Sequence, residues 1–172
     1  MPPPEANAKM QTTTLVTIVR RLGIIAMPFF LGFGVIRAVI AWDYPSFEYA
    51  RITPDSFGFT PEERLFYAHA TLDYLQRSET DDEVIFLLEE LVMPDGEPPL
   101  YLESEISHMV DVKVLTDTIR NIWYVAAVIV VGGLIFLLAQ PHLRPVGLKT
   151  IRSGGLLTVV ILTVIALLIL VA

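Results

Sequence analysis

The feature that most constrains this chain is a set of three long apolar runs, at residues 22–42, 122–139 and 155–172. A helix needs about 20 mainly apolar residues to cross the hydrocarbon core of a bilayer. Such a helix satisfies its own backbone hydrogen bonds, which a lipid-exposed loop cannot do. The runs therefore predict an all-α transmembrane protein with three spans. A hydrophobic content of 53%, high for a soluble domain of this length, agrees with that prediction.

The first apolar run has a second interpretation, because Arg20 and Arg21 stand directly before it. A cleaved secretory signal peptide also begins with basic residues and continues into an apolar segment. The run is longer than the apolar part of such a peptide, and Arg37 lies within it. We therefore favour an uncleaved span over residues 22–42.

Four side chains are expected at the membrane interface. An arginine within about two turns of the end of a span can extend its charge to the headgroups, and Trp and Tyr prefer the same region. The four residues are Arg37, Trp42, Trp123 and Tyr124. They mark the outward ends of the first two spans.

The charges are divided unevenly along the chain. Residues 43–121 hold 18 Asp and Glu against 5 Lys and Arg, whereas the remaining residues hold 1 against 7. Basic loops stay on the cytoplasmic side of a membrane, so we expect a cytoplasmic N-terminus and an outward-facing acidic segment. The predicted order is a cytoplasmic N-terminal tail (1–21), a span (22–42), an extracytoplasmic acidic cap (43–121), a span (122–139), a basic cytoplasmic loop (140–154) and a span (155–172).

The cap is predicted to contain a well-defined helix. Thr60 and Glu63 can form a capping box, and Pro61 between them suits the first helical position. The pattern predicts a helix from about residue 61 to 77. His69 falls on the apolar face of this helix and is interpreted as a satisfied core residue rather than a ligand.

A β-hairpin is predicted after that helix. Residues 84–93 form a short apolar segment, and Pro94, Asp95 and Gly96 then form a turn in which glycine accepts a positive φ. Residues 100–102 are suited to a returning strand. The predicted fold class is therefore three transmembrane helices with a small extracytoplasmic α+β cap between spans one and two.

The residue types present exclude several kinds of site. The chain has no cysteine, which rules out disulfides, thiolate nucleophiles and cysteine-based metal centres. It contains no glycine-rich phosphate loop and no Gly-x-Ser-x-Gly turn. A coherent basic face for nucleic acid is also missing. We predict no cofactor, no metal and no nucleic-acid partner.

One cluster has the residue types of a catalytic site. Ser104 caps a helix that is expected to continue into the second span, and Glu105, His108 and Asp111 follow at intervals of three, on one side of that helix. A carboxylate one turn from an imidazole can fix its tautomer and raise its basicity, as a general base requires. The alternative is an exposed amphipathic turn without chemistry. Lys113, further along, is expected to form a surface ion pair.

Motifs over residues 30–125 resemble a bacterial family of integral membrane proteins that includes Lit, the lipoprotein intramolecular transacylase. The motifs are Ile36-Arg37, Pro45-Ser46-Phe47 with Tyr49, Phe59-Thr60-Pro61-Glu62-Glu63, Leu72-Asp73-Tyr74-Leu75, Asp95-Gly96 and Glu105-Ile106-x-His108-Met109-x-Asp111-Val112-Lys113. The last string is the most specific of them.

The resemblance implies a location and an activity. Family members lie in the bacterial plasma membrane with four spans and an extracellular α/β cap, and the Lit-type enzymes are thought to move an acyl chain from the diacylglyceryl group of a lipoprotein to its N-terminal amine. His108 corresponds to the cap histidine of the family, a candidate general base for that amine. Glu105 and Asp111 would assist it.

The sequence departs from the family pattern after the third span. The family has a second key histidine in an outward loop there, whereas this sequence ends at Ala172, and His142 is predicted on the opposite side. Two interpretations follow. The favoured one is a non-catalytic accessory or scaffolding subunit that contacts other membrane-protein subunits. The alternative is an acyltransferase that uses His108 on a lipoprotein or phospholipid acyl chain.

Overall fold

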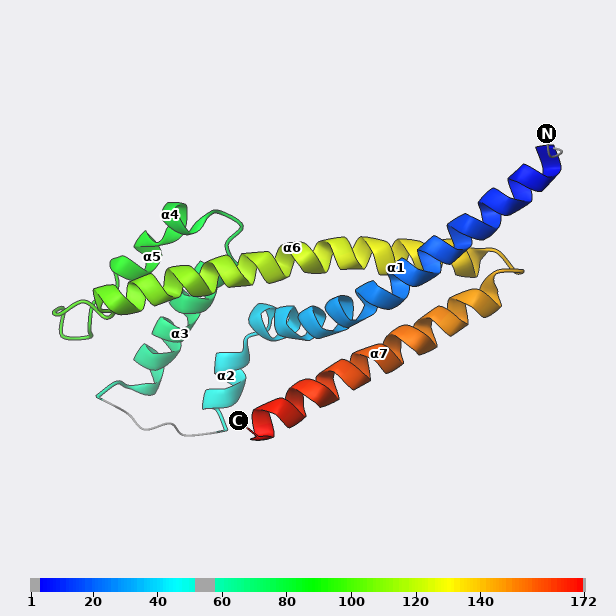
Figure 1. The fold of residues 1–172 in the computed structure, drawn as a ribbon. Coiled ribbons are helices and arrows are strands. Elements are labelled where there is room, and N and C mark those ends of the chain that lie inside the picture. Colours follow the sequence, from blue (N-terminus) through cyan, green and yellow to red (C-terminus); the bar gives the residue numbers. More distant parts are fainter. Residues whose placement is uncertain (1–3, 52–57, 172) are drawn as a thin grey trace. The chain divides into compact units, whose positions relative to one another are not determined.

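The computed structural model describes residues 4–51 and 58–171, with the backbone alone at residues 4–11. The described chain is helical, and its elements follow one another as Figure 1 shows. They are α1 (Pro4–Ala41), α2 (Tyr44–Tyr49), α3 (Pro61–Gln76), α4 (Asp81–Val84), α5 (Phe86–Glu89), α6 (Glu103–Ala139) and α7 (Arg144–Val171). Two compact units are present: a span unit of Met1–Val35 with Asn121–Ala172, and a cap unit of Ile36–Arg120.

Three of the described helices are long and apolar enough to cross a membrane. They are Thr12–Ala41, Glu103–Ala139 and Arg144–Val171. These helices contain the three apolar runs, so the prediction of a multi-pass, all-α membrane protein is confirmed. The side of the membrane on which each loop lies stays a prediction.

Within the span unit, α7 packs through a stripe of small residues. Gly147, Thr150, Gly154 and Thr158 are all buried, at helical intervals of three and four that keep them on one face. The Thr150 hydroxyl donates to the Val146 carbonyl at 2.8 Å, and the Thr158 hydroxyl donates to the Gly154 carbonyl at 2.9 Å. Both hydroxyls are therefore satisfied inside the helix, and the Thr150 methyl group faces Gly23 of α1.

Glycines on both helices allow α7 and α1 to approach each other closely. A Cβ placed on Gly154 would lie 2.8 Å from Cβ of Met27, and one placed on Gly23 would lie 3.1 Å from Cγ2 of Thr150. Membrane helices gain no hydrophobic energy from association, so close backbone approach through small residues is what holds them together.

Substitution of Gly154 by alanine is expected to destabilise the span unit by about 2 kcal/mol, because the added methyl group overlaps Met27 near its backbone. Gly155→Ala is the matched control, since a Cβ there meets nothing within 4 Å among the described residues. Alanine raises helix propensity at both sites, so the difference between the variants isolates packing. Thermal unfolding of the full chain in detergent measures it, and equal midpoints for the two variants would contradict the packing.

The contact between α1 and α6 has its own core. Ala26, Met27, Ala126 and Val130 form a buried cluster. Beside it, the indole N–H of Trp123 donates to the Phe30 carbonyl at 3.1 Å. Trp123 thus joins two helices, and its place at the membrane interface stays a prediction.

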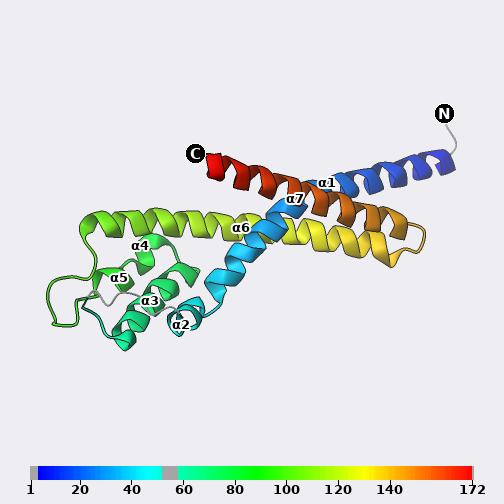
Figure 2. The ribbon, with the colours of Figure 1, turned by 90° about the horizontal axis from the view of Figure 1, so that it is seen from below.

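In the cap unit, α3 starts as its sequence predicts. The Thr60 hydroxyl accepts from the Glu63 N–H at 3.2 Å, and the Glu63 carboxylate accepts from the Thr60 N–H at 2.7 Å. Helices α3, α4 and α5 lie beside the first half of α6 (Figures 1 and 2). Their shared core consists of Tyr74, Val84 and Leu88, all buried. Burial raises the pKa of the Tyr74 hydroxyl to about 12.

The predicted α+β character of the cap is wrong, because the described residues contain no strand. Residues 84–93 contain the last residue of α4 and all of α5. Helix is favoured here because three acidic residues stand in the first turn of α4 and Glu83 accepts from the Thr80 N–H at 2.9 Å. The turn at Gly96 forms with φ +88°, as expected. The segments before and after this turn are paired by a single isolated β-bridge, between Val92 and Pro99. Pro98 and Pro99 lack the N–H groups that a longer ladder would need.

A buried lysine joins α6 to the end of α3. Lys113 has no exposed surface, and its Nζ donates to the Arg77 carbonyl at 2.7 Å and to Asp117 at 3.0 Å. Arg120 donates to the same Arg77 carbonyl and pairs with Asp117 at 2.9 Å. Two cations therefore cap the carbonyl end of α3. The ion pair predicted for Lys113 forms, but it lies in the interior of the unit rather than at the surface.

Candidate functional site

The three predicted site residues lie at the start of α6. Glu105 is in its first turn, and one oxygen of its carboxylate accepts the Leu102 backbone N–H at 2.7 Å. This contact satisfies a donor that the helix itself leaves open. Glu105 is therefore part of the helix cap, and the contact sets the direction of its carboxylate.

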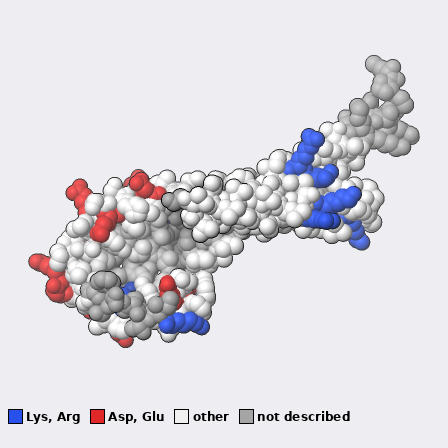
Figure 3. Space-filling model, turned by 60° about the horizontal axis from the view of Figure 1, so that its bottom comes forward, with Lys and Arg blue, Asp and Glu red and all other residues white. Residues whose placement is uncertain are grey.

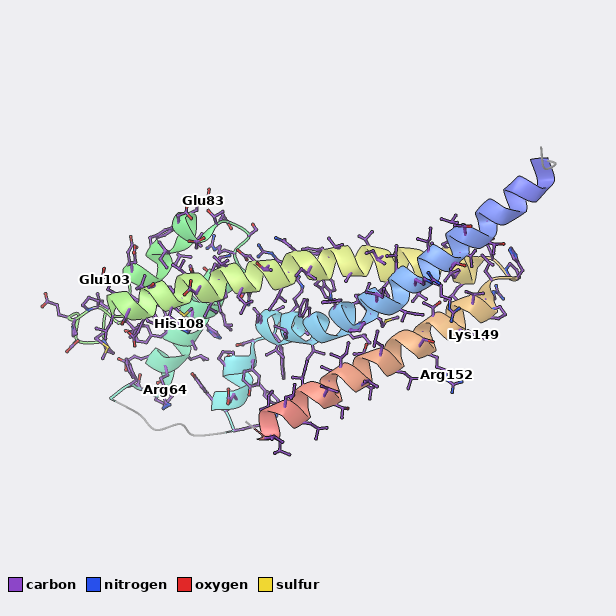
Figure 4. All side chains as sticks on the ribbon, viewed as in Figure 1. Arg64, Glu83, Glu103, His108, Lys149 and Arg152 are labelled. Atoms are coloured by element: carbon purple, nitrogen blue, oxygen red, sulfur yellow. The ribbon has the colours of Figure 1, made fainter. Side chains whose placement is uncertain are left out.

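His108, which Figure 4 labels on α6, and Asp111 follow on the next turns of this helix. Both side chains are exposed, as is that of Glu105. Over the described ranges, no hydrogen bond or ion pair joins His108 to either carboxylate. The structure thus places the three side chains on one stretch of helix without bringing them into contact. The prediction that a carboxylate orients the imidazole stays a prediction.

A hollow of about 440 Å³ adjoins Glu105 in the cap unit. Its walls come from α2, the residues just before α3, one face of α3, the 92–101 loop and α6. The lining residues are Tyr49, Phe59, Arg64, Tyr67, Ala68, Thr71, Met93, Leu100, Tyr101 and Glu105. Hydrogen bonds stiffen it, from the Tyr67 hydroxyl to the Val92 carbonyl at 2.7 Å and between the Thr71 and Tyr101 hydroxyls at 2.7 Å. The hollow therefore has mainly aromatic and aliphatic walls, with an arginine and a glutamate among them.

A second polar group was missed by the sequence reasoning. His69 is not a core residue as predicted: its side chain is 46% exposed, and its Nε2 lies 2.8 Å from Asp43 Oδ1 and 3.4 Å from the Ser46 hydroxyl. Both contacts use the same ring nitrogen, whereas a serine nucleophile needs the acid and the serine on opposite nitrogens. The group therefore links α2 to α3 and does not form a catalytic triad.

A signal for this group was present in the sequence. Asp43, a proline two positions later and Ser46 form a helix N-terminus, and Asp43 accepts the Ser46 N–H at 3.3 Å. Hydrogen bonds from Ser46, and then from His69, hold the pKa of the Asp43 carboxyl below its ordinary value of 3.8. Because the folded pKa is lowered, this link stabilises the cap at pH values above 3.8 and weakens as the pH falls through the folded pKa.

Replacing Ser46 by alanine is expected to raise the pKa of Asp43 toward 3.8, since the hydrogen bond of the Ser46 side chain is the largest cause of the lowering, while the smaller contribution of the Ser46 backbone N–H is kept. Titration of the Asp43 carboxyl by NMR measures the change. Ser107→Ala, at an exposed serine of α6, is the control and should leave the Asp43 titration as it is. An unchanged Asp43 midpoint in Ser46→Ala would contradict the assignment.

The described residues offer no group of three or more His, Asp or Glu that could hold a metal ion. The cap presents a solvent-exposed imidazole, one turn from the Glu105 carboxylate, which caps the helix and borders a hollow of mixed apolar and polar lining.

Comparison with known proteins identifies a family. A family described as "Lipoprotein intramolecular transacylase Lit" matches residues 21–172. The match extends beyond residues 30–125, where the motifs are found, and includes all three apolar helices. Neither the curated proteins nor the solved structures gave a match.

Proposed function

We propose that this chain, which belongs to the Lit family, transfers an acyl chain within a lipoprotein, from its diacylglyceryl group to its N-terminal amine. Three features support the proposal. The family is described by an intramolecular transacylation, the match runs through all three apolar helices, and His108 lies in the family-like string of α6 with its imidazole exposed. The exposed imidazole is the observation that carries the proposal.

The reaction requires a base because an N-terminal amine is largely protonated near neutral pH. In the proposed step, the protonated amine first loses one proton to water, and the His108 imidazole then accepts a second proton from the neutral amine as its nitrogen attacks the ester carbonyl. The N–C bond forms, the C–O bond to glycerol breaks, and the glycerol oxygen takes up the proton. The product is an N-acylated lipoprotein with one ester-linked chain. Proton transfer by a positioned side chain contributes about 100- to 10,000-fold to such a rate.

The proposed sidedness places His108 where this substrate lies. The predicted cytoplasmic N-terminus and basic 140–154 loop put the acidic cap outside the bacterial plasma membrane. In this proposal, the lipoprotein presents its diacylglyceryl group and its N-terminal amine at that outer surface. Cysteine-scanning with a membrane-impermeant reagent checks the sidedness, with labelling expected at Ser107→Cys and not at Ser153→Cys.

The activity is tested with the full chain in nanodiscs and a diacylglyceryl lipopeptide that has a free N-terminus. Because the transfer is intramolecular, product and substrate have the same mass, so fragmentation must locate the acyl group on the N-terminal residue. An N-acetylated lipopeptide is the matched control and should stay unchanged. A free-amine substrate that remains unmodified in the presence of well-folded protein would contradict the proposal.

A non-catalytic subunit of a larger membrane complex is the second candidate, and two observations favour it. The Glu105 carboxylate is bonded to the Leu102 N–H rather than to His108. His108 also precedes Ile122, the predicted start of the span, by roughly 14 residues, or about 21 Å of unbroken helix. If this function is right, the chain should co-purify with other membrane proteins at a fixed stoichiometry. The complex should also keep its activity when His108 is replaced by alanine.

A further inference from the structure

Five cations lie in the span unit, two of them within α1 and three in the first turns of α7. We call Arg20, Arg21, Arg144, Lys149 and Arg152 the basic belt; all five are exposed. Figure 3 shows Lys and Arg gathered on this part of the unit, and Figure 4 shows Lys149 and Arg152 on neighbouring turns near the start of α7. The belt combines residues that are far apart in the sequence.

Helix packing brings the α1 and α7 members of the belt to the same level. Gly23 of α1 faces Thr150 of α7, where an added Cβ would lie 3.1 Å from the threonine methyl group. Arg20 and Arg21 are within one helical turn of Gly23, as are Lys149 and Arg152 of Thr150. The four cations thus lie on two helices that pack against each other, next to the apolar segments of those helices.

The described side chains of this unit include no carboxylate that could balance the belt. Residues 12–35 and 121–171, whose side chains the structure describes, contain no Asp or Glu. Arg144 donates its Nε–H to the Leu138 carbonyl at 3.1 Å, at the end of α6, which leaves its positive charge without a carboxylate. The α7 helix begins here with no acid in its first turn, so its dipole adds positive potential.

We propose that the basic belt binds the phosphate groups of anionic phospholipids. Clusters of four or more Lys and Arg beside a membrane helix attract anionic headgroups. Arginine holds a phosphate with two parallel hydrogen bonds, which neighbouring Arg20 and Arg21 can provide. The adjoining apolar faces of α1 and α7 favour a ligand with acyl chains over a soluble acidic polypeptide. This binding is independent of the proposed acyl transfer.

Thermal unfolding of the full chain in a neutral detergent tests the proposal, since a ligand of the folded state raises its midpoint. Phosphatidylglycerol and cardiolipin are each expected to raise the midpoint by about 5 °C. Phosphatidylcholine should leave it unchanged, and the rise should shrink with added salt because exposed charges are screened. Glycerol phosphate at the same phosphate concentration should give no rise.

Two pairs of substitutions locate the effect. Arg20→Gln/Arg21→Gln and Lys149→Gln/Arg152→Gln are each expected to remove about half of the lipid-induced rise. Arg51→Gln/Arg77→Gln is the matched control, because it removes two exposed cations from the cap unit, and it should keep the full rise. Circular dichroism before heating establishes that each variant is folded.

Other results would overturn the proposal. Equal rises with phosphatidylcholine would make the effect a general lipid effect. A rise with glycerol phosphate alone would assign the belt to soluble phosphate, and one with polyglutamate alone would assign it to an acidic polypeptide. Full lipid response in both belt variants would remove the belt as its source.

Discussion

Replacing Lys113 by methionine is expected to destabilise the cap unit by about 3 kcal/mol. Lys113 is fully buried and donates to both the Arg77 carbonyl and the Asp117 carboxylate. Methionine has a similar volume, so the loss reports the missing charge and donors rather than a cavity. Removing one member of a buried pair costs about 3–5 kcal/mol. The lower end applies because Arg120 still contacts Asp117 at 2.9 Å.

Hydrogen exchange of the full chain measures this change where it occurs. Amides of α3 and of the first half of α6 should exchange roughly 100-fold faster, since about 1.4 kcal/mol corresponds to a factor of ten. Lys149→Met is the control, because that lysine is exposed, and it should change exchange in these segments by little. Adding Asp117→Asn to Lys113→Met should cost less than the sum of the two single changes, as expected for groups in one network.

Replacing His108 by alanine is expected to lower the rate of acyl transfer by about 100- to 10,000-fold if the imidazole is the base. Because His108 is exposed, the substitution leaves no cavity, and the folded state should be retained. The rate of N-acylation of the free-amine lipopeptide measures the effect. Added imidazole should restore part of the activity in the alanine variant, because a free base can occupy the position of the missing ring.

The other histidines provide matched controls for this substitution. His142→Ala makes the same chemical change at an exposed position of the 140–143 turn and should leave the rate unchanged. His69→Ala breaks the contact with Asp43 and is expected to affect the stability of the cap more than its chemistry. A His108→Ala protein that transfers acyl groups as fast as the unchanged protein would refute the catalytic role.

Local rules predicted the helices well but not the packing of the cap. The apolar runs and the Thr60–Glu63 capping box are properties of neighbouring residues, and both were confirmed. The incorrect hairpin prediction depended on the apolar run at 84–93, which is too short to distinguish a strand from a helix. Acidic residues at the start of α4 and the prolines 98 and 99 decided the outcome, and both features are visible in the sequence.

The candidate site was predicted only in part, because spacing gives position and not contact. The interval of three places Glu105 and His108 on one side of α6, but the Glu105 carboxylate bonds to a backbone N–H, which competes with any bond to the imidazole. His69 and Lys113 were assigned from the apolar or polar character of their helix faces. Their partners, Asp43 and the Arg77 carbonyl, lie far from them in the sequence.

The small-residue stripe on α7 also implies an order of assembly. Gly147 contacts Leu137 and Leu138, which are about ten residues earlier, across the short 140–143 turn. Gly154 meets Met27, more than 100 residues away in the chain. Closing a short loop loses less chain entropy than closing a long one, so near contacts form before distant ones. The helical hairpin of α6 and α7 is therefore expected to form first. Helix α1 is expected to pack last, against the surface that the paired helices present.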